Sequence, residues 1–154
     1  NLFKVSQAMM FFPTLWINWN KKNFIYRLKP PIQPVIDAGL VPRISNMSNS
    51  QNIPASVKAT WALTNVASGT TVQCQSIIDK GESIICIINQ IQNLGIVEQA
   101  IWAIGNIASD CVFYRDTIIR SGGLLNLVEV IQKTNDDSIL KHGSWALSNL
   151  CRGN

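Results

Sequence analysis

Apolar residues in this chain recur at three- and four-residue steps. They include Val57, Trp61, Leu63 and Ala67, and a series of isoleucines between residues 77 and 91. A helix presents one face at steps of three to four residues, whereas a half-buried strand alternates apolar and polar positions. Strand-like alternation is nearly absent, so the pattern predicts helices.

The helical pattern is organised in a repeat of about forty residues. Trp61, Trp102 and Trp145 are 41 and 43 residues apart and stand in the phrases WALTN, WAIGN and WALSN. A second marker, IDAG, IDKG and IRSG, keeps the same period. Repetition at this length is the signature of a solenoid, in which stacked units share one core.

Each unit is predicted to hold three helices: a short one up to the marker glycine, a second after it, and a third with the tryptophan. Gly69, Gly81 and Gly122 stand where a left-handed residue would close a helix. One of residues 136–138, Asp-Asp-Ser, is expected to cap the next helix. Residues 1–29 are rich in aromatics, fit no copy of the unit and receive no assignment.

Every tryptophan of the repeat is followed four residues later by an asparagine. The pairs are Trp61/Asn65, Trp102/Asn106 and Trp145/Asn149. Residues four apart lie on one face of a helix. An indole face attracts the cation of lysine or arginine by about 0.5–2 kcal/mol, and an asparagine amide can bond an extended backbone whatever its side chains. The pairs predict a groove for a basic peptide of about six to nine residues.

A single tryptophan in a helical repeat is more often a core residue than a ligand contact. Three copies, each with its asparagine, favour a shared binding face, because a buried amide needs polar partners that an apolar core does not offer. Asp110 and Glu98 are predicted to pair with cations of the ligand. Gly105 is interpreted as a close helix-packing site, and His142 as a groove-edge residue or part of a solvated face.

Three segments, 59–70 (ATWALTNVASGT), 98–110 (EQAIWAIGNIASD) and 143–153 (GSWALSNLCRG), closely resemble the armadillo repeats of importin alpha, an adaptor family that reads nuclear localisation signals. Residues 30–43 are similar to that family's first armadillo unit. The resemblance implies an all-α armadillo-repeat solenoid, a right-handed superhelix of three-helix repeats, over residues 30–154, with about three repeats and the last truncated. It also implies a receptor for basic cargo peptides that serves protein import and occurs in cytoplasm and nucleus.

The resemblance implies individual site residues as well. A key lysine of the signal is expected to meet Asp110 together with Ser68, Gly69 and Thr70, while Gln99 and the tryptophan–asparagine pairs hold the peptide backbone. The complete expected set is Trp61, Asn65, Ser68, Gly69, Thr70, Gln99, Trp102, Asn106, Asp110, Trp145 and Asn149. Two positions differ from the family pattern: Cys74 replaces a usual threonine, and His142 replaces an asparagine before the third tryptophan.

The resemblance also names a second partner. Importin beta is expected for the family, but the Arg/Lys-rich arm that would bind it is absent from the amino-terminal segment. The chain also stops just after the third tryptophan–asparagine pair, whereas the family continues through further repeats. We therefore expect a fragment or a truncated product.

Composition narrows the other function classes. The basic excess lies in residues 1–50, with six Lys/Arg against one acid, whereas residues 51–154 hold seven against eight, which argues against nucleic-acid binding. No apolar stretch is long enough to cross a membrane. One histidine, no Gly-rich phosphate loop and four cysteines without a CxxC pair favour neither an enzyme nor a metal or cofactor site. An armadillo adhesion scaffold and a non-functional truncated product remain the alternatives.

Overall fold

The structure, a computed structural model, describes residues 30–78 and 93–152, and within these ranges all regular secondary structure is helical. The helices are α2 (Ile32–Asp37), α3 (Val41–Ser48), α4 (Ile53–Ala67), α5 (Thr71–Ile78), α7 (Leu94–Asp110), α8 (Val112–Arg120), α9 (Gly123–Lys133) and α10 (Asp137–Leu150). None of these helices is long and apolar enough to span a membrane.

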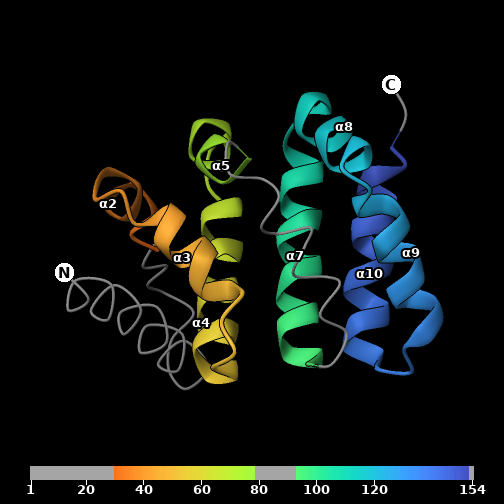
Figure 1. Ribbon diagram of the computed structural model, residues 1–154. Coiled ribbons are helices and arrows are strands. Elements are labelled where there is room, and N and C mark those ends of the chain that lie inside the picture. The colour runs from red at the N-terminus through yellow and green to blue at the C-terminus, as the bar shows by residue number, and fades with distance from the viewer. Residues whose placement is uncertain (1–29, 79–92, 153–154) are drawn as a thin grey trace, which may run out of the picture.

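The predicted three-helix unit is confirmed at both ends of the described chain. Helices α2, α3 and α4 form one unit, and α8, α9 and α10 form another (Figure 1). The unit between them contributes α5 and α7. Its expected second helix falls in residues 79–92, outside the described residues, as does Gly81.

The three long helices each begin at a residue whose side chain caps the first turn. Asn52 accepts a hydrogen bond from the N–H of Ala55 at the start of α4, and Asn93 accepts one from the N–H of Ile96 at the start of α7. Asp136 caps α10. A side-chain oxygen at this position satisfies one of the amides that the first turn leaves without a partner. Of the three candidate caps at residues 136–138, Asp136 makes the bond.

Two marker glycines, Gly39 and Gly122, close helices through a left-handed backbone, and Gly69 does not. Gly122 has φ +82°, as expected, and Gly39 at the same place in IDAG has φ +64°. The expectation for Gly69 is wrong. Its N–H bonds the carbonyl of Val66, and the N–H of Ser68 bonds that of Asn65. These short-range bonds end α4 without a left-handed residue.

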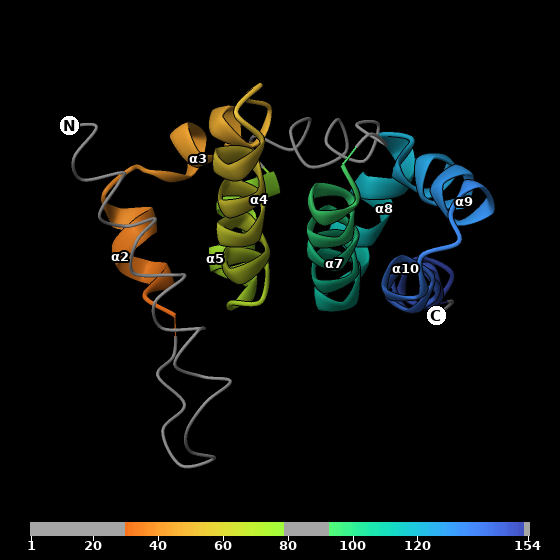
Figure 2. The ribbon, with the colours of Figure 1, turned by 90° about the horizontal axis from the view of Figure 1, so that it is seen from below.

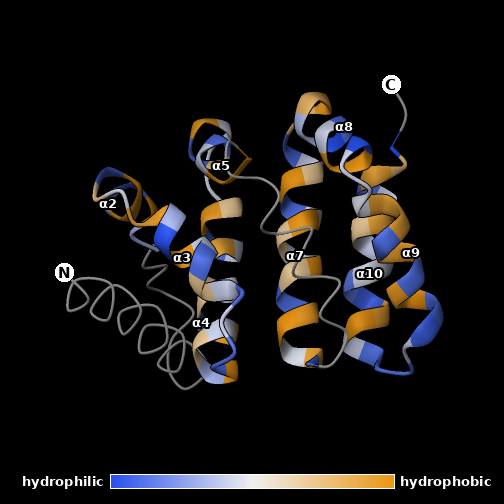
Figure 3. Cartoon of the chain, in the orientation of Figure 1, coloured by the Kyte–Doolittle hydropathy of each residue, from blue (hydrophilic) through white to orange (hydrophobic). Residues whose placement is uncertain are grey.

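The three tryptophan-bearing helices, α4, α7 and α10, lie side by side (Figures 1 and 2). The middle helix is apolar along most of its length (Figure 3), and Ile96, Ile101 and Ile104 on it are fully buried. Burying one such side chain contributes about 1.5–3 kcal/mol. One unit therefore supplies core to both neighbours, which holds the tryptophan helices at a fixed spacing.

Candidate functional site

The repeated tryptophans are not sealed in the core. Trp102 on α7 is 37% exposed and Trp145 on α10 is 39% exposed. Trp61 on α4 is half-buried and packs against the core. Partly exposed indoles on successive helices are available to a ligand, whereas full burial would have removed the predicted groove. That the three share one concave face stays a prediction.

Trp145 lies against the backbone of the preceding unit at Gly105. A Cβ atom built on Gly105 would stand 2.1 Å from Cζ3 of the Trp145 ring, far inside van der Waals contact. The interpretation of Gly105 as a close packing site is confirmed. The group that packs against it is the indole of Trp145.

The asparagines join neighbouring units. Nδ2 of Asn106 donates to the carbonyl of Thr64 at 3.4 Å, and Nδ2 of Asn149 donates to the carbonyl of Gly105 at 3.1 Å. Both acceptors stand three residues after the tryptophan of the preceding unit. The first asparagine, Asn65, instead donates to a carbonyl of its own helix. In two of the three pairs, therefore, one amide donor stabilises the stack.

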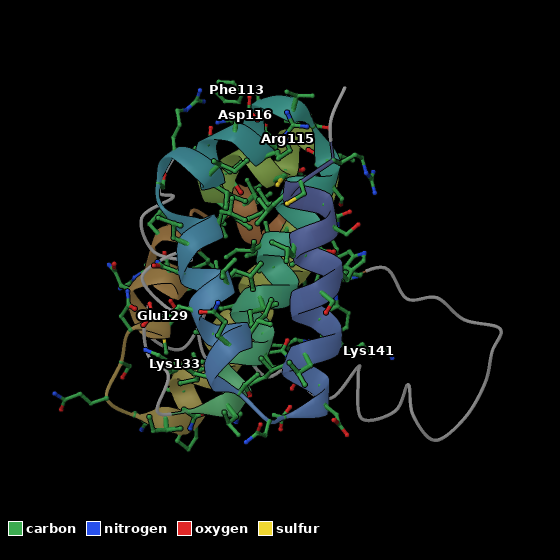
Figure 4. All side chains as sticks on the ribbon, turned by 90° about the vertical axis from the view of Figure 1, so that its right-hand side faces the viewer. Phe113, Arg115, Asp116, Glu129, Lys133 and Lys141 are labelled. Atoms are coloured by element: carbon green, nitrogen blue, oxygen red, sulfur yellow. The ribbon has the colours of Figure 1, made fainter. Side chains whose placement is uncertain are left out.

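Asn149 departs from its expected role as an open contact. It is 3% exposed, and its Oδ1 accepts a hydrogen bond from Nη2 of Arg152 at 3.0 Å. Arg115 on α8 in turn donates to the carbonyl of Arg152 at the end of α10 (Figure 4). The premise that a buried amide would lack partners fails here, because a backbone carbonyl and a guanidinium supply them.

The buried position predicts that Asn149→Ala lowers stability. The change removes the bond from Asn149 to the Gly105 carbonyl and the bond that Arg152 donates to Asn149, and each lost hydrogen bond costs about 0.5–1.5 kcal/mol. Asn46→Ala is the control, because Asn46 is an exposed residue of α3. Its expected change in the free energy of unfolding is within about 0.5 kcal/mol. Urea unfolding followed by circular dichroism measures both. Equal costs would show that the Asn149 amide does not join the units.

Asp110 lies where the resemblance places the lysine contact. Its Oδ1 accepts a hydrogen bond from the hydroxyl of Thr71 at 3.0 Å, and Thr71 directly follows the turn of Ser68, Gly69 and Thr70. The structure thus brings the carboxylate at the end of α7 to the start of α5. Sequence reasoning missed Thr71, although its place beside Thr70 was the available signal.

Cys74 is buried beneath the same corner. Burial, then the charge of Asp110, then that of Cys111, raise the pKa of the Cys74 thiol from 9.0 to about 12. Each of these effects disfavours the thiolate. The thiol is therefore neutral at physiological pH, and Asp110 remains the anionic group of the corner.

Gln99 is partly exposed, and one end of its side chain is covered. Its side-chain oxygen is buried and has no hydrogen-bond partner among the described residues, while its backbone carbonyl accepts from the hydroxyl of Thr64 at 2.8 Å. The contact with Thr64 ties α7 to α4. A role for the Gln99 amide in holding peptide stays a prediction.

His142 of α10 contacts α7, which favours the groove-edge interpretation over the solvated face. Its ring stacks on Trp102 with centroids 5.3 Å apart and planes at 9°. Its Nδ1 stands 3.3 Å from Oε1 of Glu98, an ion-pair distance when the imidazole is protonated. A residue of one unit thus covers part of the tryptophan of the unit before it.

Several known proteins are similar to this chain in sequence. Residues 29–68 match the Armadillo/beta-catenin-like repeat. Importin subunit alpha-2 of Arabidopsis thaliana is 39% identical over 126 residues, which are 80% of this chain and 24% of that protein. Importin subunit alpha-2 of Caenorhabditis elegans is 35% identical over 135 residues, 86% of this chain and 25% of that protein. The chain thus spans about a quarter of the length of these relatives.

Among solved structures, a designed armadillo repeat protein in complex with the peptide (KR)4 superposes with a TM-score of 0.72. The sequence identity is 26%, and the match covers 77% of this chain and 50% of that one. The (KR)4 peptide is the partner of the designed protein in that complex.

Proposed function

We propose that this chain, an armadillo-repeat protein related in sequence to importin alpha subunits, binds an extended Lys/Arg-rich peptide of the nuclear-localisation-signal kind along α4, α7 and α10. The observation that carries the proposal is the pair of partly exposed indoles, Trp102 and Trp145, on neighbouring helices of successive units. The names of the importin relatives and the basic peptide of the designed protein support the same ligand class.

The proposed groove divides its work between side chains. The indoles take the aliphatic stems and cations of lysine and arginine, while Asn65 and Asn106, both partly exposed, bond the peptide backbone. Helix α7 carries two acids, Glu98 and Asp110, and no base. Its field therefore favours a cationic ligand. Asn149 is left out because its amide is buried and engaged.

Asp110 is proposed as the partner of one lysine of the peptide. Its carboxylate is exposed beside Thr71 and the 68–70 turn, so a cation reaches it without deep burial. In a cell, a chain that holds such peptides would act as an adaptor for cargo proteins on their way into the nucleus, moving between cytoplasm and nucleus.

A titration with a labelled KKKRK peptide tests peptide binding directly. Fluorescence anisotropy should rise to saturation with the basic peptide and not with an EEEDE peptide of equal length. Added salt should weaken the binding, because charge pairs at exposed sites are screened. Equal binding of both peptides, or of neither, would contradict the proposal.

Reversing the charge of Asp110 tests the proposed lysine contact. Asp110→Lys should weaken KKKRK binding roughly tenfold, which corresponds to about 1.4 kcal/mol, because attraction becomes repulsion. Asp116→Lys on α8, whose native carboxylate pairs with Arg115, should change the affinity much less. Both variants are compared by melting temperature first. Similar losses of affinity in the two variants would show that Asp110 acts only through the overall charge.

A further inference from the structure

The exposed face of Trp102 is already partly occupied by a side chain of this chain. The imidazole of His142 lies nearly parallel to the indole, with ring centroids 5.3 Å apart, within the range of stacked aromatic pairs. Trp102 belongs to α7 and His142 to α10, so the stack crosses from one unit to the next.

The same imidazole is adjacent to a carboxylate. Glu98 stands one helical turn before Trp102 on α7, so the two share a face, and its Oε1 is 3.3 Å from Nδ1 of His142. An aromatic face and a carboxylate are the two groups that attract a cationic side chain. At this position His142 stacks on the aromatic face and lies beside the carboxylate.

We propose that His142 determines specificity at the Trp102 position of the groove, an inference that rests on the proposed peptide binding. The imidazole takes the place that a lysine or arginine of the ligand would occupy on the indole. A basic side chain of the peptide gains the Trp102 contact only by displacing it. The Trp102 position therefore binds lysine and arginine more weakly than the Trp145 position does, whereas Asp110 continues to favour them.

Among the described residues, charged side chains on the helices around α10 are Glu98 and Asp110 on α7, Arg115, Asp116 and Arg120 on α8, and Glu129 and Lys133 on α9. Helix α10 carries Asp137 and Lys141, and Asp136 and Arg152 flank its ends. Arg115 pairs with Asp116, and Lys133 with Glu129 (Figure 4). Among these groups Glu98 is the one recorded within ion-pair distance of the imidazole.

The test compares the native chain with His142→Asn and with Lys141→Gln, a control that removes an exposed positive charge one residue away. We expect His142→Asn to bind labelled KKKRK roughly threefold to tenfold more tightly at pH 7.5. A panel of peptides, each with one basic residue replaced by alanine, should contain one peptide whose affinity for His142→Asn falls several-fold. The affinity of the native chain for that peptide should change little.

The stack itself can be measured without any peptide. His142 is the single histidine of the chain, so its imidazole proton signal in the NMR spectrum needs no assignment. The indole ring current should displace that signal, and Trp102→Leu should return it toward the position of an exposed histidine. An unchanged signal in Trp102→Leu would overturn the proposed stack.

The binding outcomes separate the two proposals. If the native chain and His142→Asn bind KKKRK equally, His142 does not determine specificity, although peptide binding stands. If Lys141→Gln gains as much as His142→Asn, net charge explains the gain and the inference falls. If neither protein binds the basic peptide, the proposed function fails, and this inference fails with it.

Discussion

Iodoacetamide at pH 8 is expected to leave Cys74 unmodified long after Cys151 has reacted. Cys151 is exposed, whereas Cys74 is fully buried, and its thiol has a pKa raised to about 12. The thiolate is the reacting form. At pH 8 the thiolate fraction of Cys74 is therefore roughly a thousandfold lower than that of a thiol with the ordinary pKa of 9.0, and burial slows the reaction further.

Peptide mass spectrometry of samples taken over time measures each cysteine separately. The control is the same reaction in 6 M guanidinium chloride, where burial is lost and the two cysteines should react at similar rates. Asp110→Asn should raise the reactivity of Cys74 only slightly, because burial is the larger cause of its raised pKa. Similar rates for Cys74 and Cys151 in the native chain would show that the corner beneath Asp110 is open.

A second large effect is expected from Gly105→Ala, whose sign should depend on Trp145. In the native chain the new methyl group collides with the Trp145 ring, and overpacking of this kind costs about 1–3 kcal/mol. In a Trp145→Ala background the space is free. There the same change should stabilise α7 by up to about 1 kcal/mol, because alanine is the better helix former.

The coupling between the two positions is therefore expected to reach about 2–4 kcal/mol, obtained from urea unfolding of the two single variants, the double variant and the native chain. Gly95→Ala at the start of α7 is a matched control, since a Cβ there meets its nearest neighbour at an acceptable 3.4 Å. Additive effects of Gly105→Ala and Trp145→Ala would mean that the indole does not rest on this glycine.

Local chemistry was sufficient to predict the elements of the fold. The spacing of Trp61, Trp102 and Trp145 predicts the unit, the apolar steps predict its helices, and the short polar cluster before α10 predicts a cap there. The apolar steps and the cap act within a few residues of the chain, so packing between units changes them little, and the repeat length follows directly from the recurrence of the tryptophans. Gly69 shows the limit even locally, because competing short-range bonds end α4 in another way.

The sequence by itself determined an armadillo-type stack and the helix on which each candidate residue outside the 68–70 turn lies, because periodicity and phrase repeat with the unit. Only the tertiary structure decided what each side chain of the site can offer. Three identical-looking asparagines differ because Asn149 reaches the carbonyl of Gly105 and meets Arg152, and two similar indoles differ because His142 stacks on Trp102. The contacts of Asn149 with Gly105 and of His142 with Trp102 join residues about forty positions apart, and their geometry depends on how one unit packs against the next.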